Sequence, residues 1–367
     1  MKVFHCSNCN HLIFFENTAC VNCGALLAFL PDRMQMAALV QQQGNDWAVA
    51  VRVVTDAASS ASYRLCHNYT AYNICNWTIP AHLPDALCQS CRLTRIVPNL
   101  SVPGNRSAWA KLEMAKRRLV YSLLSLRLPV VGKEDDEERG VIYEFLADDA
   151  MPHGKKVVTG HDEGLITLNI AEADDAERER RRLALKEPYR SLIGHFRHEV
   201  GHYYWDRLIA STDRLPAFRA LFGDEELNYG EALEAHYKNG APANWQESFV
   251  SSYATMHPWE DWAETWAHYM HMVDTLSTSA ACGLSIRPQR TDEPRADVVN
   301  NITDVTTAPF DILIDNWLPV AYTLNNLNRS LGLNDAYPFV LSAPAIDKLR
   351  FVHETIRGKP RQIHLYF

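Results

Sequence analysis

The stretch FRHEVGHYYWD (residues 196–206) contains two histidines four positions apart, with a glutamate directly after the first. Apolar and aromatic residues recur at helical spacing through it, which predicts a partly buried α-helix. His198 and His202 then project from one face, one turn apart, and can bind the same metal ion. Glu199 is offset from them, so it does not compete for the metal but can take a proton from a water molecule there. The stretch therefore predicts a metal site on a helix.

A catalytic zinc normally has three protein ligands and an open position, so the two histidines need a third ligand from elsewhere in the chain. The best candidate segment is SSYATMHPWEDWAETWAHYMHM (residues 251–272), in which Pro258 marks the start of a helix. Glu260 and Glu264 lie one turn apart on this helix. We expect one carboxylate to bind the metal and the other to orient a histidine ligand through a hydrogen bond.

Together the two segments resemble the gluzincin branch of zinc metallopeptidases, in which HExxH precedes a helix of the form ExxAE. The segment EDWAETW (residues 260–266) is similar to the glutamate helix of anthrax lethal factor. The resemblance implies that Glu260 is the zinc ligand and that Glu264 supports a ligand histidine. It also implies that Tyr253, seven residues before the ligand glutamate, acts as an electrophile toward the tetrahedral intermediate. Asp206 lies where gluzincins often carry a supporting aspartate.

Other histidines compete with the glutamate for the place of third ligand. A histidine there would make the site resemble that of SprT-like DNA-associated proteases. The competing residues are His257, His268 and His271.

The first cysteine group consists of two CxxC knuckles, CSNC (residues 6–9) and CVNC (residues 20–23), with ten residues between them. A knuckle directs two thiolates toward one ion, and two knuckles joined by a short hairpin complete a closed zinc-ribbon site. The predicted ligands of this structural zinc are Cys6, Cys9, Cys20 and Cys23.

The second cysteine group is looser, because only CQSC (residues 88–91) is a knuckle. Two more ligands are needed, and Cys66 and Cys75 are nearest, with His67 as the alternative. The knuckles could also exchange partners between the two groups. Four protein ligands leave no open position, so we expect both ions to be structural and their binding to be part of folding. The predicted second site is Cys66, Cys75, Cys88 and Cys91; Cys282 is expected to be a buried, inert thiol.

A chain of 367 residues can hold more than one domain. IVPNLSVPGN (residues 96–105) reads as a linker, which predicts a zinc-ribbon region at residues 1–100 and a zincin-like metallopeptidase domain at residues 105–367. The expected fold class is α+β: one or more zinc-ribbon-type β modules, then a mostly α domain with a small mixed sheet.

Local patterns place the other elements. A helix is expected at residues 107–126, capped near Ser107, with Lys116, Arg117 and Arg118 on a solvated face. The alternating charges of residues 174–188 favour an exposed helix or loop with local ion pairs. Further expected elements are strands at residues 141–146, 155–160 and 164–173, and helices at residues 310–332 and 342–358.

The composition, 47% hydrophobic and 22% charged, is that of an ordinary globular protein, and no apolar run reaches the roughly 18 residues of a membrane span. The formal net charge of −8 argues against nucleic acid as a partner. The start MKVFHCSNCN (residues 1–10) lacks the pattern of a secretory signal. We therefore expect a cytoplasmic protein without membrane contact, in which cysteines serve metal sites rather than disulfides.

Over nearly the whole chain the order of motifs resembles the zinc-binding metallopeptidases of bacteria that carry an N-terminal zinc ribbon. Besides the two cysteine groups, the resemblance rests on CRLTR (residues 91–95), EMAKRRL (residues 113–119) and HFRHEVGHYYWDRL (residues 195–208). It implies a cytosolic bacterial peptidase. The distance from His202 to Glu260 exceeds that of short gluzincins, so an inserted segment is expected around residues 207–245.

The leading functional prediction is a zinc metallopeptidase that acts on a peptide or protein substrate, with one catalytic and two structural Zn²⁺ ions. Glu199 would act as general base and Tyr253 would stabilise the oxyanion, while the strand at residues 164–173 would be the sheet edge that receives an extended peptide. In the alternative, the zinc ribbons recruit a protein or nucleic acid and the zincin body has little or no turnover. A third arrangement, in which the N-terminal region controls access to the cleft, also stays open.

Overall fold

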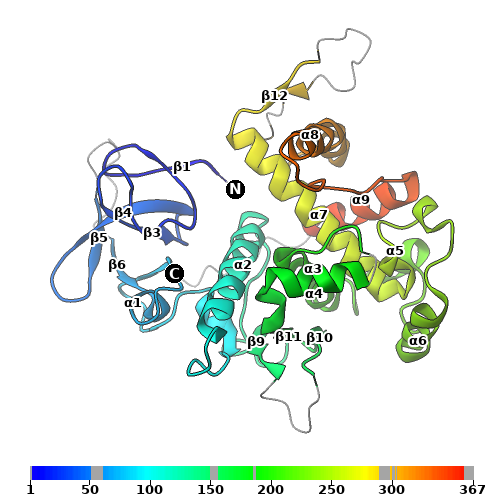
Figure 1. Cartoon of the computed structure of the whole chain (residues 1–367), viewed down its shortest axis with the longest axis horizontal. Coiled ribbons are helices and arrows are strands. Elements are labelled where there is room, and N and C mark those ends of the chain that lie inside the picture. Colours follow the sequence, from blue (N-terminus) through cyan, green and yellow to red (C-terminus); the bar gives the residue numbers. More distant parts are fainter. Residues whose placement is uncertain are drawn as a thin grey trace. The chain divides into compact units, whose positions relative to one another are not determined.

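A computed structural model of the chain describes residues 2–50, 61–148, 156–184, 187–288, 298–299, 302 and 304–358. The chain forms two compact units (Figure 1). The ribbon unit contains residues 2–159 and 167–174, and the helical unit contains residues 160–166 and 175–361, as far as these are described. The units interleave in sequence, and the division into residues 1–100 and 105–367 stays a prediction.

The ribbon unit begins with a short antiparallel hairpin and continues into an antiparallel sheet in which each strand pairs with the next along the chain. Aromatic rings fill its core: Phe29 packs on Trp77 with ring centroids 4.7 Å apart, and both are fully buried. The hairpin is β1 (Phe4–His5) and β2 (Leu12–Ile13), and the sheet consists of β3 (Leu26–Leu30), β4 (Gln35–Gln41), β5 (Trp47–Val49), β6 (Ser62–Leu65) and β7 (Thr78–Pro80).

A mixed four-stranded sheet has the order β10-β11-β9-β8. Its strands are β8 (Thr94–Ile96), β9 (Ile142–Leu146), β10 (Gly160–Asp162) and β11 (Leu165–Asn169). Two sequence predictions were wrong here. The strand expected at residues 155–160 is β10, which begins only at Gly160. Lys155 itself lies outside the described residues. The expected peptide-binding edge at residues 164–173 is an inner strand followed by a 3-10 helix, η4 (Ile170–Ala173), so the edge strand is β10.

Helix α2 (Asn105–Ser125) begins earlier than predicted, because Gly104 with its positive φ of 91° is the N-cap, not Ser107. The expected solvated basic face was also wrong. Lys116 is completely buried and forms an ion pair with the equally buried Glu113 at 3.0 Å. A buried charge requires such a partner. Arg117 is buried as well, and Arg118 is the half-exposed member, paired with Glu16 at 2.6 Å.

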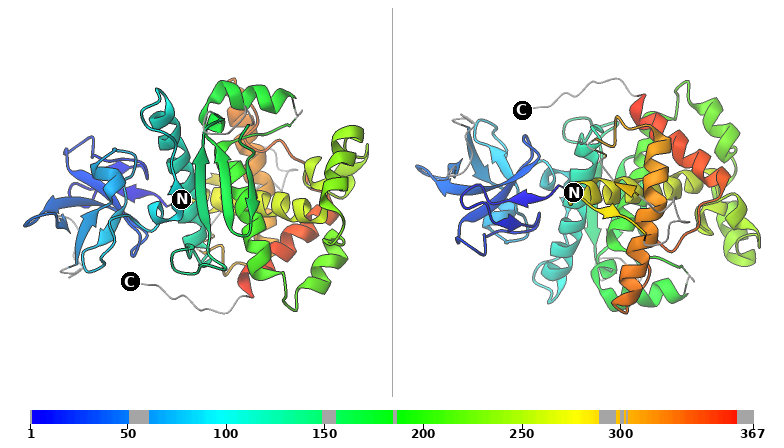
Figure 2. Two further views of the ribbon diagram at one scale, coloured as in Figure 1. Left: turned by 90° about the horizontal axis from the view of Figure 1, so that it is seen from below. Right: turned by 90° about the horizontal axis from the view of Figure 1, so that it is seen from above.

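Alternating charges stabilise α3 (Asp175–Ala184) as predicted, for instance through the Arg181–Glu177 pair at 2.8 Å. The predicted helices near the C-terminus are confirmed, and both pack against α7 (Figure 2). The remaining elements of the helical unit are α4 (Leu192–Leu208), α5 (Leu215–Phe222), α6 (Tyr229–Asn239), η5 (Trp245–Glu247), η6 (Tyr253–Thr255), α7 (Pro258–Ala281), β12 (Ser285–Ile286), β13 (Val298–Val299), α8 (Phe310–Ser330) and α9 (Ala343–Arg357); α1 (His67–Thr70) and η1 (Cys91–Leu93) belong to the ribbon unit.

Helices α4 and α7 make the most extensive helix–helix contact of the described residues, and Gly201 permits their close approach. A β-carbon at this position would lie 3.1 Å from the α-carbon of Ala263 and 3.2 Å from Cβ of Trp266. The Gly201 carbonyl also accepts a hydrogen bond of 2.8 Å from Nε1 of Trp262. The small size of Gly201 thus lets the two helices approach closely, and the fully buried Trp262 links them by a hydrogen bond.

The predicted fold class is confirmed: a strand-rich ribbon region precedes a mostly helical part with a small sheet. Cys282, by contrast, is exposed and not buried as expected. Among the residues that the structure describes, no helix combines the length and apolar character that crossing a membrane requires.

Candidate metal centres

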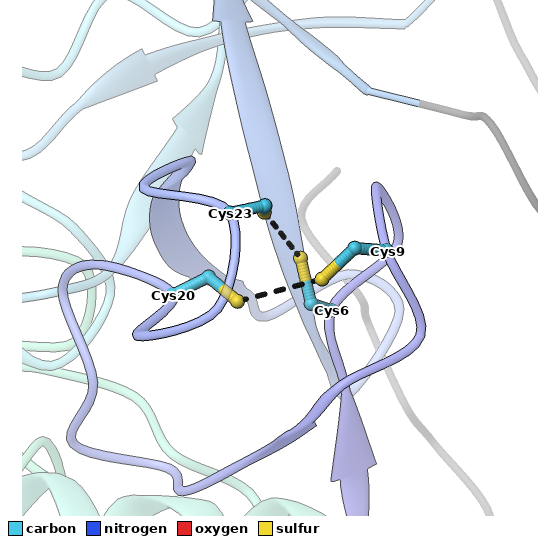
Figure 3. Close-up of side chains that lie close together, drawn as sticks. All are labelled: Cys6, Cys9, Cys20 and Cys23. Carbon is cyan, nitrogen blue, oxygen red and sulfur yellow. Dashed lines mark hydrogen bonds between the residues drawn. The ribbon is translucent and has the colours of Figure 1, made fainter.

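The first cysteine group gathers at the tips of two loops, and Figure 3 shows its four sulfur atoms pointing toward one another. Sγ of Cys6 lies 3.8 Å from that of Cys23, and Sγ of Cys9 lies 3.6 Å from that of Cys20. Cys6 is buried and Cys23 is exposed. The side-chain amide of Asn8 donates to Cys23 at 3.4 Å and lowers the pKa of that thiol to about 6. Four thiols at these distances suit a tetrahedral zinc ion.

The second group is buried throughout, and each group gathers its own four cysteines. Sγ of Cys75 lies 3.7 Å from the sulfurs of both Cys88 and Cys91. The backbone N–H of Cys88 donates to Sγ of Cys66 at 3.3 Å. Burial raises the pKa of the Cys88 thiol, so a bound cation is needed to hold it as thiolate. The alternative ligand His67 is exposed and lies outside this group.

Arg117 of α2 lies within the electrostatic field of the second cysteine group. Burial of its guanidinium lowers the pKa, but the negative charges of Cys75 and Glu113 outweigh this effect and raise it. A centre of four thiolates and one Zn²⁺ carries a net charge of −2, which a buried cation offsets. The helix whose basic face was expected in solvent therefore supplies a counter-charge.

The third group joins α4 to α7. Nε2 of His198 lies 3.0 Å from Oε2 of Glu260, and Nε2 of His202 lies 3.5 Å from Oε1 of the same carboxylate. The three ligand atoms fall within 4.8 Å of one another. Oε2 of Glu260 is buried without a hydrogen-bond partner among the described residues. Two imidazoles and a carboxylate with such an unsatisfied oxygen form a donor set that fits zinc.

A second carboxylate fixes the orientation of the first histidine. Nδ1 of His198 lies 2.7 Å from Oε1 of Glu264, which leaves Nε2 free to face Glu260. Ser251 donates to the other oxygen of Glu264 at 2.5 Å. Burial alone would raise the pKa of Glu264, but the hydrogen bond from His198 outweighs it and lowers the pKa to about 2. The pair thus selects the His198 tautomer whose Nε2 can bind a metal.

The two residues expected to act on a substrate lie beside this group. Glu199 is buried, and burial raises its pKa despite the opposing influence of His198 and His202. Tyr253, from η6, places its ring centroid 6.0 Å from that of His198. Its pKa is raised by burial and by the charge of Glu260, so its hydroxyl stays protonated and can donate.

Asp206, the expected supporting aspartate, lies near His161. Its Oδ2 lies 3.9 Å from Nε2 of His161 on β10, and the His161 ring stacks on that of His202 with centroids 6.0 Å apart. Trp259 packs on His202 with ring centroids 4.0 Å apart and lies 6.0 Å from the His161 ring. The three rings thus form one cluster, and Asp206 approaches it at His161.

Sequence reasoning missed Tyr229, which begins α6 in the inserted segment. Its hydroxyl donates to Oε1 of Glu260 at 2.9 Å. No motif includes this residue, and only the path of the inserted segment brings it to the carboxylate. The expected inserted segment around residues 207–245 is the one sequence signal that includes it.

Within the described part of the chain, the competing histidines make other contacts. His257 is the N-cap of α7 and accepts a hydrogen bond from the Trp259 N–H at 3.1 Å. Nδ1 of His268 lies 2.7 Å from the Tyr337 hydroxyl. His271 packs against Tyr337 with ring centroids 5.3 Å apart. The group of metal-ligand atoms on α4 and α7 contains none of the three.

Two four-cysteine groups and a third group of histidine and carboxylate ligands define a zinc-binding protein with a mixed α+β fold. The chain belongs to a family of zinc metallopeptidases. The family model described as "Putative zinc-binding metallo-peptidase" matches residues 105–355, and a model described as "zinc-ribbon domain" matches residues 3–102.

Relatives from mycobacteria match the chain over nearly its whole length. Proteins of Mycobacterium bovis and of two strains of Mycobacterium tuberculosis, each described as uncharacterized, are 43% identical over 357 residues, which is 97% of this chain and 95% of theirs. No solved structure gave a significant match.

Proposed function

We propose that the protein is a gluzincin-type zinc peptidase that cleaves peptide bonds with an activated water molecule. The observation that carries the proposal is the ligand group itself: His198 and His202 face Glu260, while Glu264 orients His198 from behind. Oε2 of Glu260 has no hydrogen-bond partner among the described residues and lies 3.0 Å from Nε2 of His198, a separation at which one cation can contact both atoms. The ligand set includes no third histidine, which disfavours the SprT-like alternative.

The proposed zinc content is one catalytic ion at the histidine and glutamate ligands and one structural ion in each cysteine group. When bound, the catalytic zinc supplies a Lewis acid that lowers the pKa of a bound water molecule and polarises a carbonyl group.

The chain's own residues supply the proton transfers and the oxyanion contact. Glu199 takes a proton from the attacking water and later passes one to the leaving amine, a task that its raised pKa favours. Tyr253 keeps its proton and donates a hydrogen bond to the developing oxyanion. Glu264 and Ser251 hold His198 in the tautomer that the reaction requires.

The test is Glu199→Gln, which keeps the shape of the side chain but removes the base. We expect about 10²–10⁴-fold slower cleavage of casein or a peptide library, with unchanged zinc content. The control is Glu234→Gln on the exposed side of α6, which should leave the rate unchanged. Wild-type cleavage by Glu199→Gln would overturn the proposal. A protein partner of the ribbons and a cytoplasmic location stay predictions.

A further inference from the structure

The inserted segment reaches the metal centre through one hydroxyl group. Tyr229 donates to Oε1 of Glu260 at 2.9 Å, and its hydroxyl also interacts electrostatically with that of Tyr253. Its ring packs against those of His257 and Trp259, with centroids 5.4 and 6.2 Å away. The tyrosine therefore lies between the carboxylate that is proposed to bind zinc and the tyrosine that is proposed to act on the substrate.

The two oxygens of Glu260 have different surroundings. Oε1 accepts the Tyr229 hydrogen bond, whereas Oε2 is buried without a hydrogen-bond partner among the described residues and lies 3.0 Å from Nε2 of His198. A carboxylate can bind a cation through one oxygen or through both. With Oε1 already engaged, this arrangement favours ligation through Oε2 alone, and an open position is thereby preserved.

Helix α6 depends on these same contacts for its place. It has no buried residue, although its N-terminus is capped by Asn228, whose side chain accepts from the Glu231 N–H at 3.1 Å. Tyr229 and His236 are seven residues apart and so share one face of the helix. His236 packs on Tyr253 with ring centroids 5.8 Å apart. This face of α6 is thus directed at the site rather than at a hydrophobic core.

We propose that Tyr229 is a positioning residue that restrains Glu260 to bind the metal through one oxygen, and that it thereby couples the inserted segment to metal affinity. The inference rests on the proposed ligand set of the catalytic zinc. It assigns the inserted segment a role in building the centre, in addition to any contact with substrate. The carboxylate that binds the ion is then oriented from outside the two ligand helices, as outer hydrogen bonds orient ligands at other metal sites.

Tyr229→Phe tests this, because it removes the hydroxyl and keeps the ring packing. The measurement is zinc affinity by chelator competition, without any substrate. We expect the ion at the histidine and glutamate ligands to bind about 10–100-fold more weakly, and the cysteine-bound ions to be unaffected. The matched control is Tyr237→Phe on the same helix, whose side chain is 67% exposed and which should bind zinc like the wild type.

A spectroscopic readout separates positioning from a general loss of stability. Zinc is removed from the third centre alone with a chelator and replaced by Co²⁺, whose visible absorption weakens as the coordination number rises. Tyr229→Phe should show weaker absorption than Tyr237→Phe, because Glu260 can then bind through both oxygens. Equal affinity and equal spectra in the two variants would overturn the proposal. If wild-type protein binds zinc here but cleaves no peptide, the proposed function fails and this inference stands.

Discussion

The cysteine groups and the histidine–glutamate group both suit zinc, but they would hold it in different ways. Each cysteine group brings four sulfur atoms together, and in the second group all four are buried. The third group offers three ligand atoms, and a buried glutamate and a tyrosine lie beside it. Four protein ligands leave no position on a tetrahedral zinc ion for water or substrate, whereas three protein ligands leave one.

The neighbours of the ligands differ as much as the ligands do. Backbone N–H groups and the buried Arg117 surround the second cysteine group, and these neutralise charge without adding a reactive group. The third centre is surrounded by titratable side chains with shifted pKa values, such as Glu199 and Tyr253. Shifted titratable groups beside an incomplete ligand shell are therefore what distinguishes a candidate reactive site from a structural one.

The largest effect is expected from breaking the closed centre. Cys88→Ser removes one buried ligand, and the ribbon unit should lose stabilisation on the order of 10 kcal/mol, since zinc binding there is coupled to folding. The measurement is thermal unfolding together with zinc content. His198→Ala is the comparison: it should lose one ion while the fold persists. Equal melting temperatures for the two variants would contradict this distinction.

Acid should affect the helical unit through buried histidines that are not part of the ligand group. Burial lowers the pKa of His268 and His353 to about 4 and that of His271 to about 3. An unfolded histidine titrates near 6.5, so the unfolded state binds more protons between these values. The stability contribution is therefore complete above about pH 6.5 and is lost as the pH falls toward about 4.

His353→Gln tests this pH dependence. Neutral His353 contacts Tyr269 through Nδ1 at 2.9 Å and the Ala308 carbonyl through Nε2 at 3.1 Å, and glutamine can offer both a donor and an acceptor. Between pH 7.5 and pH 4.5, the melting temperature of this variant should fall less steeply with decreasing pH than that of the wild type. Identical slopes would argue against the histidine as a source of acid sensitivity.

A smaller effect is expected from Glu264, which contacts the ligand histidine His198 rather than the ion. Glu264→Gln removes the charge that receives the His198 Nδ1–H, so we expect about 10–100-fold weaker binding of the third ion alone. Chelator titration checks this, with the cysteine-bound ions as the internal reference. A loss of all three ions together would mean that Glu264 supports the fold rather than the ligand.

The smallest effect is expected at the exposed rim of the first cysteine group. Asn8→Ala removes the exposed hydrogen bond to Cys23, and exposed hydrogen bonds contribute little because water replaces them. Zinc release from this group should be at most a few-fold faster, and the second group should not respond. A large change at the second group would contradict the separate ligand sets.

Much of this arrangement follows from spacing. Helical periodicity places His198 beside His202 and Glu260 one turn from Glu264, so a metal group is predictable once the two helices are assumed to meet. Paired knuckles similarly predict the cysteine groups. What the sequence lacks is the path of the connections: Tyr229 reaches Glu260 because of the course that residues 207–245 take in the fold, and no local pattern encodes that course.

The burial of charged side chains was also not predictable from the sequence. The run Lys116, Arg117 and Arg118 has the composition of a solvated face, yet its first two residues are buried. Lys116 pairs with Glu113 on the same helix, whereas Arg117 interacts with the cysteines of the second group, which are far away in sequence. The exposure of Cys282 could not be predicted for a similar reason. An apolar residue at the end of a helix can face either the core or the solvent, and Cys282 is exposed.

The glycine between the two ligand histidines has a consequence for metal choice. Gly201 faces Ala263, which lies between Glu260 and Glu264 on α7. The separation of the two backbones at this point limits the radius of an ion that ligands from both helices could share. We expect Gly201→Ala, whose methyl group would press on Ala263, to shift metal preference toward larger cations such as Cd²⁺. Metal preference would then depend on a residue that has no ligand atom.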